Sequence, residues 1–409
     1  AGLNWVSDNF GWWLVLFALI LVLLVFGLAF SKAGDVVIGG AGAKPEYTMW
    51  QWFSMSLKGG IGTGILFWAM GEPIFHMAAP PAAAGAQPFT REAGLFAISQ
   101  TMLHWTIAQY AMYSLCAVGV ALMAYNRRRT ISVSSIFEPY LSSSVYGVVK
   151  TVVPMVSLFC IVGALACSMA VGLMQINSGL NFFFGLPIDG VTVFAIAAIM
   201  VTVYVVSCLT GIKKGMRVLS SFCTIVFIGL MVYVLCLGPT RFIVDAGTES
   251  LGVFFNRFFE HSVILPTMAG NETWSKSWII MFMASFFVYA PIIGLFLARL
   301  GKGRTVREFI FMNIGAPTLF CIVWIAIWGG TTVWLQYTGI MDVWQSVNEK
   351  GLEVTIFTIL STLPFAKILA AFFIIAVFFR SRQWLIRLRV PWRLCRRRIF
   401  PSMTRRRAG

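Results

Sequence analysis

The chain has 409 residues, of which 59% are hydrophobic and 11% are charged, and its formal net charge is +16. This composition excludes a soluble globular protein, whose surface would need about twice that share of charged residues. The mean hydropathy is +0.83, and nine apolar runs are long enough to cross about 30 Å of hydrocarbon, so we predict an all-α polytopic membrane protein. The predicted spans are 11–30, 50–77, 94–124, 148–183, 190–210, 218–238, 277–298, 309–336 and 354–379.

Two of these spans, 94–124 and 148–183, are longer than a crossing requires, which predicts tilt or a bend. The positions of lysine and arginine predict the orientation. With the N-terminus outside, twelve of these residues fall in inner loops and five in outer loops, as the positive-inside rule requires. The C-terminus is then cytoplasmic.

The N-terminal region, residues 1–48, combines a peripheral first span with an inner loop. The chain begins Ala1-Gly-Leu-Asn-Trp5 without an initiator methionine, so we expect further sequence upstream. No basic segment precedes the span at 11–30 and no cleavage site follows it, which argues against a secretory signal peptide.

Five glycines interrupt the second span between Lys58 and Pro73. Each glycine costs a helix roughly 1 kcal/mol relative to alanine, so this segment favours a helix that breaks in mid-membrane. The backbone groups that a break frees are tolerated where they line a cavity holding an ion, water or a polar ligand. Close helix packing is the alternative, because Gly60 and Gly64 also fit the Gly-x-x-x-Gly spacing.

The third span carries three aromatic residues, Trp105, Tyr110 and Tyr113. On a continuous helix they lie within about 140° of one face and over about two turns. Such a group can hold a cation against its π faces. An aromatic packing face or a membrane-interface belt would give the same pattern.

The sequence contains no nucleophile elbow or phosphate-binding loop, and its three histidines, His76, His104 and His261, are scattered without metal-ligand spacing. We therefore predict that the protein is not an enzyme and holds no metal. Glu72 is interpreted as a helix-end residue or an outer gate, and Lys58 either as a functional cation or as a side chain reaching into an aqueous cavity. Seven of the eight cysteines lie in spans and are interpreted as small core residues rather than disulfide partners.

Two segments outside the spans have distinctive compositions. Residues 239–276 form a long outer segment with an amphipathic interfacial helix predicted around Gly252–Phe259. From Arg380, the last thirty residues contain eleven arginines and no lysine, aspartate or glutamate. A polybasic tail lying on anionic lipid would have this composition.

Five short motifs follow one another along the chain. They are Gly60-Ile-Gly-Thr-Gly64, Glu72-Pro73, His104-Trp-Thr with Tyr113, the segment from Ala166-Cys-Ser to Leu180, and the segment from Gly294 to Phe309. In order and spacing they resemble the betaine/carnitine/choline transporter family. The resemblance implies an inverted-repeat fold like that of neurotransmitter-sodium symporters, with a first five-helix repeat at 49–238 and a partial second repeat at 277–379, separated by the outer segment.

The resemblance also implies a set of solute-binding residues. These are Gly60, Gly62, Gly64, Trp105, Tyr110, Tyr113, Ser285, Phe286 and Tyr289. Ser285, Phe286 and Tyr289 occupy the positions of a tryptophan-rich box in the family, and a cage of Phe and Tyr has a weaker quadrupole and more room. A larger or less fully methylated ammonium compound, or a sulfonium compound, is therefore as good a candidate as glycine betaine.

The sequence does not identify the coupling ion, and no cofactor is expected. Where sodium-dependent relatives carry hydroxyl side chains this chain has Ile161 and Leu165, which cannot coordinate a cation that prefers oxygen. A second sodium site of the family uses backbone carbonyls, here near Gly60 and Ile61, with hydroxyl residues just beyond Phe379.

The resemblance thus implies a secondary active transporter. It would move a quaternary ammonium, sulfonium or methylated-amine solute, an osmolyte such as betaine, choline or carnitine, across a bacterial inner membrane by alternating access. Its partners would be the solute, the lipid bilayer and, in the full-length form, two further copies in a homotrimer, with no nucleic acid. The family fold has one helix before these spans and two after them. We therefore interpret residues 380–409 as the product of a frameshift or chimeric assembly, and the alternative function is a truncated membrane polypeptide without transport.

Overall fold

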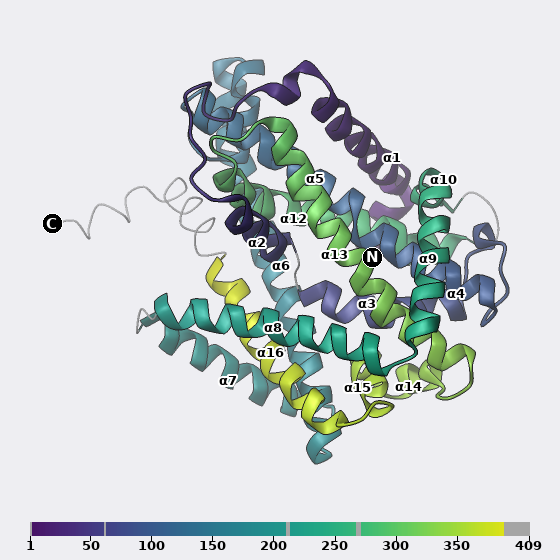
Figure 1. The fold of residues 1–409 in the computed structure, drawn as a ribbon. Helices are drawn as coiled ribbons and strands as arrows, with labels where there is room; N and C mark the ends of the chain where they lie inside the picture. Colours follow the sequence, from purple (N-terminus) through teal and green to yellow (C-terminus); the bar gives the residue numbers. More distant parts are fainter. Residues whose placement is uncertain (1, 61–62, 210–212, 267–270, 388–409) are drawn as a thin grey trace.

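The computed structural model describes residues 2–60, 63–209, 213–266 and 271–387, and within these ranges the chain is helical apart from one isolated bridge between Val37 and Thr305 (Figure 1). The α-helices are α1 (Gly2–Phe30), α2 (Met49–Gly60), α3 (Thr63–Ala78), α4 (Arg91–Trp105), α5 (Ile107–Ala121), α6 (Ser143–Phe184), α7 (Gly190–Leu209), α8 (Lys213–Leu237), α9 (Thr240–Asn256), α10 (Phe258–Ser262), α11 (Glu272–Ser275), α12 (Met281–Leu297), α13 (Val306–Tyr337), α14 (Val343–Lys350), α15 (Thr355–Ser361) and α16 (Ala366–Arg387). A π-helical turn, η5 (Lys276–Ile280), joins α11 to α12.

Each of the nine predicted spans coincides with one helix or with two consecutive helices, which confirms the predicted fold class. Within the described ranges, five helical segments are long and apolar enough to cross a membrane. They are Asn4–Phe30, Arg91–Asn126, Ser143–Phe184, Glu272–Leu300 and Val306–Tyr337. Other predicted spans contain shorter described helices, such as the 16-residue α3 and the apolar part Ala366–Phe379 of α16, which do not meet the length criterion alone.

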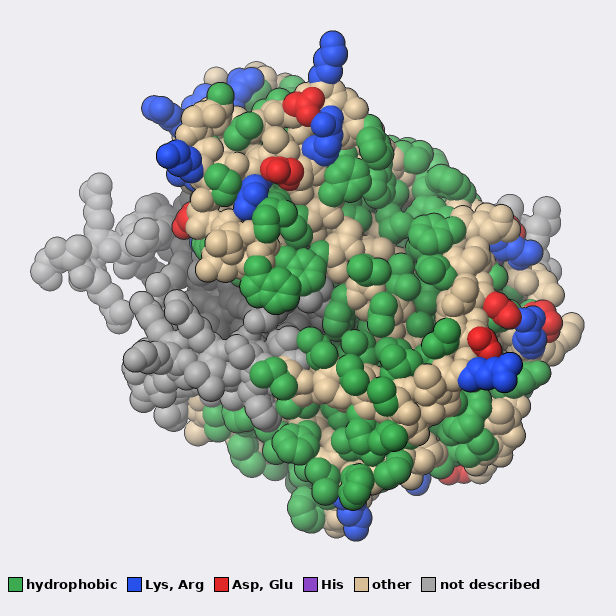
Figure 2. All heavy atoms as spheres, in the orientation of Figure 1, with side chains coloured by type: hydrophobic (Ala, Val, Ile, Leu, Met, Phe, Trp, Pro, Cys, Tyr) green, Lys and Arg blue, Asp and Glu red, His purple; other side chains and the backbone are tan. Residues whose placement is uncertain are grey.

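The outer surface is apolar. Large hydrophobic side chains that a soluble protein would bury are exposed along α1, α6 and α7, among them Trp12, Leu23, Phe159 and Phe194. On the face shown in Figure 2 hydrophobic side chains cover most of the middle, and charged side chains lie towards the periphery, in the upper part, at the right edge and at the bottom. This distribution is that of a protein whose sides contact lipid and whose ends contact water.

The two long spans differ in the continuity of their helices. The span predicted at 94–124 is interrupted at Thr106, whose backbone (φ −124°, ψ −116°) leaves the helical region and separates α4 from α5. The span predicted at 148–183 is the unbroken 42-residue helix α6, which continues through Pro154. The first of these spans is therefore interrupted, and the second is a single helix.

The glycine-rich span is helical in both of its described parts. The helix α2 ends at Gly60 and α3 begins at Thr63. Ile61 and Gly62 lie outside the described residues, so the helix break that the sequence predicts at this point stays a prediction.

The outer segment contains a longer helix than predicted. A bend of 106° separates the end of α8 from α9, and α9 runs from Thr240 to Asn256 rather than around Gly252–Phe259. Pro239 precedes the first turn, where its missing N–H costs nothing. The buried stripe of α9 comprises Ile243, Ala246, Gly247, Ser250 and Phe254. Gly247 lets α9 approach α13 closely, because a Cβ atom there would stand 3.0 Å from Cβ of Ala326.

The core of the molecule is formed where α3, α4, α5, α12 and α13 pack against one another (Figure 1). Its largest fully buried side chains include Trp324 and Trp328 of α13 and Tyr110 and Tyr113 of α5. At the C-terminal end, α16 continues past the change of composition at Arg380 as far as Arg387. Residues 388–409 of the arginine-rich tail lie outside the described residues.

Candidate functional site

A cavity of about 280 Å³ lies where the N-terminal part of α3, the junction of α4 and α5, the middle of α6 and one face of α12 meet. Its wall is formed by Gly64, Trp68, Trp105, Gln109, Tyr113, Cys167, Ser168, Val171, Met281, Phe282, Ser285, Phe286, Tyr289 and Ile293. None of these fourteen residues carries a formal charge, and six of them are aromatic. The wall thus offers π faces to an occupant, together with a small number of amide and hydroxyl groups.

Six of the nine solute-binding residues expected from the sequence lie in this wall. They are Gly64, Trp105, Tyr113, Ser285, Phe286 and Tyr289. Gly60 ends α2, and Gly62, like Ile61 of the expected backbone ion site, falls outside the described residues.

Tyr110 lies elsewhere, and this corrects the expectation. Its hydroxyl is 3.3 Å from Sγ of Cys321 on α13. The expectation assumed one continuous helix through the aromatic residues, whereas the interruption at Thr106 shifts the angular position of α5 relative to Trp105. Tyr113 then faces the cavity, and Tyr110, three residues earlier, faces α13.

Gly64 and Trp105 form the closest contact between α3 and α4 at the cavity. A Cβ atom on Gly64 would stand 2.8 Å from Cη2 and 3.2 Å from Cζ3 of the Trp105 ring, so no side chain fits there unless the ring moves. Trp105 is the last residue of α4, directly before the interruption at Thr106. The absence of a side chain at Gly64 and the helix interruption at Thr106 therefore both leave room for this indole at the wall of the cavity.

Several wall residues were not predicted, although some lie four residues from a predicted residue and therefore on the same helix face. Trp68 follows Gly64 by four residues, and Phe282 precedes Phe286 by four, so each lies on the same helix face as a predicted neighbour. Cys167 and Ser168 belong to the Ala166-Cys-Ser motif, which the sequence analysis used only for its resemblance. Cys167 is exposed rather than packed in the core, contrary to the expectation for the cysteines.

The polar groups of the wall are partly bonded to one another. Gln109 Nε2 donates to the hydroxyl of Tyr113 at 3.1 Å, while Gln109 Oε1 is buried without a hydrogen-bond partner among the described residues. The hydroxyl of Tyr289 donates to the carbonyl of Ala164 at 3.1 Å and lies 3.3 Å from Oγ of Ser168. The unpaired Gln109 oxygen is an acceptor that an occupant carrying a hydroxyl or an amine proton can satisfy.

Behind Trp105 lies a buried cluster that corrects two interpretations of the sequence. Glu72, His76 and His104 are each 0% exposed, and their ligand-type atoms lie within 4.8 Å of one another. Glu72 lies inside α3, two turns from its end at Ala78, and is not a helix-end residue. His76 and His104 are 28 positions apart in sequence, but the packing of α3 on α4 brings both side chains to Glu72, so the histidines are not scattered.

Hydrogen bonds to Glu72 connect the members of this cluster. Glu72 Oε1 lies 2.5 Å from Nδ1 of His104 and 3.1 Å from Nε2 of His76, and Oε2 accepts a bond from the Trp105 indole at 2.8 Å. The separation of 2.5 Å is that of a hydrogen bond, whereas two ligands of one tetrahedral Zn²⁺ stand about 3.3 Å apart. The residues therefore have a metal-ligand composition without metal-site spacing.

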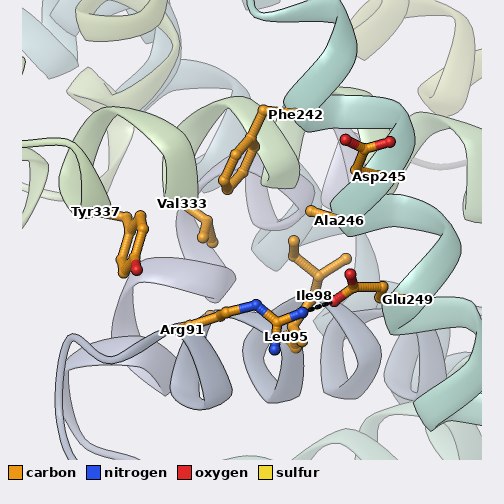
Figure 3. Close-up of a pocket in the computed structure, with 10 residues that line it drawn as sticks. Arg91, Leu95, Ile98, Phe242, Asp245, Ala246, Glu249, Val333 and Tyr337 are labelled. Atoms are coloured by element: carbon orange, nitrogen blue, oxygen red, sulfur yellow. Dashed lines mark hydrogen bonds and ion pairs between the residues drawn. The ribbon is translucent and has the colours of Figure 1, made fainter.

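A second cavity, of about 250 Å³, lies between α4, α9 and α13. Figure 3 shows the Arg91 guanidinium directed across it to the carboxylate of Glu249, with which it forms an ion pair. Asp245, Phe242 and Tyr337 complete its polar and aromatic lining. Both members of the ion pair are about half exposed, so this cavity is an open surface feature that links α9 to α4.

Comparisons with known proteins agree with the resemblance noted in the sequence. The sequence profile described as "BCCT, betaine/carnitine/choline family transporter" matches residues 1–381. A probable glycine betaine transporter of Desulfitobacterium hafniense is 29% identical over 359 residues, which are 88% of this chain and 71% of that protein. An osmo-dependent choline transporter of Acinetobacter baylyi is 30% identical over 333 residues, 81% of this chain and 48% of that protein. An ectoine/hydroxyectoine transporter of Virgibacillus pantothenticus is 28% identical over 376 residues, 92% of this chain and 74% of that protein.

Proposed function

Since the chain belongs to the betaine/carnitine/choline transporter family, a family of multi-pass membrane transporters and not of enzymes, we propose that it is a secondary active carrier that binds its solute in the cavity beside Trp105. The solute is a quaternary ammonium compound or a related sulfonium or methylated amine. The carrier works by alternating access in the inner membrane of a bacterium, with the C-terminus in the cytoplasm.

The observation that carries this proposal is the wall of the cavity. Among its fourteen residues the aromatic rings of Trp68, Trp105, Tyr113 and Phe286 surround a volume suited to a small solute, and no lysine or arginine opposes a positive charge. A methylated ammonium group keeps its charge but donates no hydrogen bonds, so aromatic faces can replace its weakly held water. Each such contact contributes about 0.5–2 kcal/mol when desolvated.

The rest of the solute would meet polar groups at the edge of the cage. Gln109 Oε1 is an unpaired acceptor for a hydroxyl group, and Ser168 and Ser285 offer hydroxyl groups to a carboxylate. Choline and glycine betaine share a trimethylammonium group and differ in this part of the molecule, whereas ectoine carries its positive charge on a ring. The similar relatives named above include proteins described as transporters of each of these three compounds.

Alternating access would use the two repeats expected at 49–238 and 277–379. The cavity draws its wall from both, since α3 to α6 contribute one side and α12 the other. Relative motion of the two halves would therefore open it to either face of the membrane. The outer segment 239–276, which contains α9, would link the halves, and the homotrimer would form through surfaces outside the cavity. Transport would be driven by sodium, by protons or by exchange for a second solute.

Uptake into proteoliposomes tests the proposal. The full 409-residue chain is reconstituted, and uptake of radiolabelled choline, glycine betaine and ectoine is measured with and without sodium and pH gradients. Saturable uptake of at least one solute, abolished by Trp105→Ala, is the expected result. Solute binding in detergent without uptake in vesicles would favour the alternative of a non-transporting polypeptide, and saturable uptake that survives Trp105→Ala would refute the assigned cage.

A further inference from the structure

The C-terminal part of α6 carries buried polar side chains that have no partner. Gln175, Asn177 and Ser178 are at most 2% exposed. Gln175 Oε1, both amide atoms of Asn177 and the hydroxyl of Ser178 have no hydrogen-bond partner among the described residues. A buried polar group without a partner costs about 1–3 kcal/mol, so such a group is best accommodated where a bound ion or molecule completes its bonds.

The neighbour of Gln175 defines which end of its amide is free. Nε2 lies 3.5 Å from the carbonyl oxygen of Leu66 on α3, and a carbonyl can only accept, so the NH₂ group faces Leu66 and Oε1 is the free end. Gln175 and Ser178 are three residues apart and therefore share one face of α6. Asn177 lies about 100° from Ser178 around the helix axis, on a different face.

A buried carboxylate lies in a segment that packs against α3 and α6. Glu353 belongs to a short 3₁₀ helix, η7 (Leu352–Val354), which contacts both helices. The residue is 6% exposed, and among the described residues no basic side chain pairs with it. Burial raises the pKa of Glu353, since no opposite charge offsets the loss of water. Lys350, three residues earlier, is exposed in the last turn of α14.

Contacts on either side of Glu353 in the chain connect it to both helices. Leu352 packs on Gly71 of α3 and occupies the space that a side chain there would need. Phe357 of α15 packs on Gly179 of α6, where a Cβ atom would stand 2.8 Å from the Phe357 ring. Glu353 lies between these two contacts in the chain, so its carboxylate is enclosed where η7 meets α3 and α6.

The free oxygens of α6 belong to the same junction. Ser178 directly precedes Gly179, which contacts α15, and Gln175 reaches across to Leu66 of α3. The junction thus combines one buried carboxylate with an amide oxygen and a hydroxyl that have no partner among the described residues. A buried negative charge of this kind is expected to have a positive partner.

We propose that the junction is a sodium-binding site in which the Glu353 carboxylate, Gln175 Oε1 and the Ser178 hydroxyl are protein ligands. Hard cations take oxygen ligands, and the free groups of these three side chains present oxygen. One carboxylate balances one positive charge, so a monovalent ion leaves the buried site neutral, whereas a divalent ion would leave an uncompensated charge. The ion stabilises the packing of η7 against α3 and α6.

This site is separate from the sodium positions that the family resemblance implies. One of those lies near Ile161 and Leu165, and Gln175 is ten residues beyond Leu165, about 15 Å along α6. The other uses the backbone near Gly60, at the end of α2. The inference also goes beyond the proposed function, because sodium binding at the junction can be measured without any solute.

Sodium binding to the purified full chain tests the inference. Binding of ²²Na⁺ is measured by equilibrium dialysis in detergent, and thermal unfolding is recorded at increasing NaCl with KCl keeping the ionic strength constant. We expect saturable sodium binding and an unfolding midpoint that rises with sodium occupancy, because an ion that binds only the folded state stabilises it. Potassium alone should not raise the midpoint in this way.

Two variants remove ligands. Glu353→Gln keeps the size of the side chain and removes its charge, and the carboxylate has no ion-pair partner among the described residues to lose. We therefore expect this variant to fold, to be at least as stable as the parent without sodium, and to lose the sodium response. Ser178→Ala should weaken sodium binding on the order of tenfold, as for the loss of one hydrogen-bonding group that contacts a charge.

Two further variants are controls. Asn177→Leu removes an unpartnered buried amide from a different face of the same helix, and Glu349→Gln removes an exposed carboxylate from α14. Both should keep the sodium response of the parent. Loss of the response in Asn177→Leu as well would show that disturbed packing, and not a lost ligand, explains the effect, which would overturn the assignment.

Other outcomes would also overturn it. These are the absence of saturable sodium binding, a sodium response that survives Glu353→Gln, equal stabilisation by potassium, and stabilisation by acid that sodium does not reproduce, which would identify a proton on Glu353 in place of an ion. None of these results depends on uptake. Sodium binding that follows the expected pattern in a chain that takes up no solute would support the site and reject the carrier assignment alone.

Discussion

A methyl group added to Gly64 would lie 2.8 Å from Cη2 of Trp105, closer than real Cβ atoms approach a neighbour. The indole is also bonded to Glu72 through its Nε1–H, so a ring displaced by a side chain at position 64 would strain that hydrogen bond. The position of the cage wall is thus determined by the absence of a side chain on one helix and by a carboxylate on the same helix two turns later.

Gly64→Ala should therefore weaken solute binding while leaving the protein folded. Displacing the ring by a few tenths of an ångström lengthens its contact with the solute, and we expect an apparent affinity lower by about tenfold, as for the loss of one good cation–π contact. Uptake kinetics in proteoliposomes measure the change. Gly252→Ala on α9 is the matched control, because no atom lies within 4 Å of its added Cβ. Equal behaviour of the two variants would contradict the close contact.

Trp105→Phe should distinguish the contribution of the aromatic face from that of the hydrogen bond to Glu72. The smaller ring retains a π face but has no N–H for Glu72, so we expect residual uptake with a lower affinity, whereas Trp105→Ala should abolish uptake. Trp12→Ala, which removes an exposed indole from α1, serves as the control and should leave uptake unchanged. Full activity in Trp105→Phe would show that the hydrogen bond to Glu72 plays no part in positioning the ring.

Glu72→Ala should destabilise the protein strongly. The substitution leaves the N–H groups of His76, His104 and Trp105 buried without an acceptor, and removing one partner from a buried charged network costs about 3–5 kcal/mol. Thermal unfolding in detergent should show a clearly lower midpoint. Glu349→Ala, an exposed glutamate on α14, should change the midpoint little. A Glu72→Ala protein as stable as the parent would mean that water fills the place of the carboxylate.

Breaking the ion pair in the second cavity should have a small effect. Arg91 and Glu249 are about half exposed, and ion pairs of this kind contribute about 0–1 kcal/mol because solvent screens them. Arg91→Gln should therefore shift the unfolding midpoint slightly, and by less at high salt. A loss of several kcal/mol that persists at high salt would identify the pair as a structural connection between α4 and α9.

The all-helical, polytopic character of the chain could be predicted because apolar length is a local property of the sequence, but of the nine predicted spans only five contain a described helix that meets the length and hydropathy criteria alone. The α12 side of the cage came from the family resemblance, which implied Ser285, Phe286 and Tyr289, and these three residues lie in the wall of the cavity.

The cluster around Glu72 could not be found in this way. Its members come from α3 and α4, and only the packing of these helices brings His76 and His104 to one carboxylate. The misplacement of Tyr110 has a related cause. A helical wheel requires a continuous helix, and the helix is interrupted at Thr106, which is neither a glycine nor a proline.

The length of α6 limits how the chain can sit in a membrane. Its 42 residues extend about 63 Å, and even at a tilt of about 40° they would rise about 48 Å, more than the full thickness of a bilayer with its headgroups. One end must therefore project into water as a rigid rod, and Lys150 in its third turn from the N-terminus would lie on the projecting part under the expected orientation. An amine-reactive, membrane-impermeant reagent would then label this lysine from one side of the membrane only, so the labelling would report the orientation of the chain.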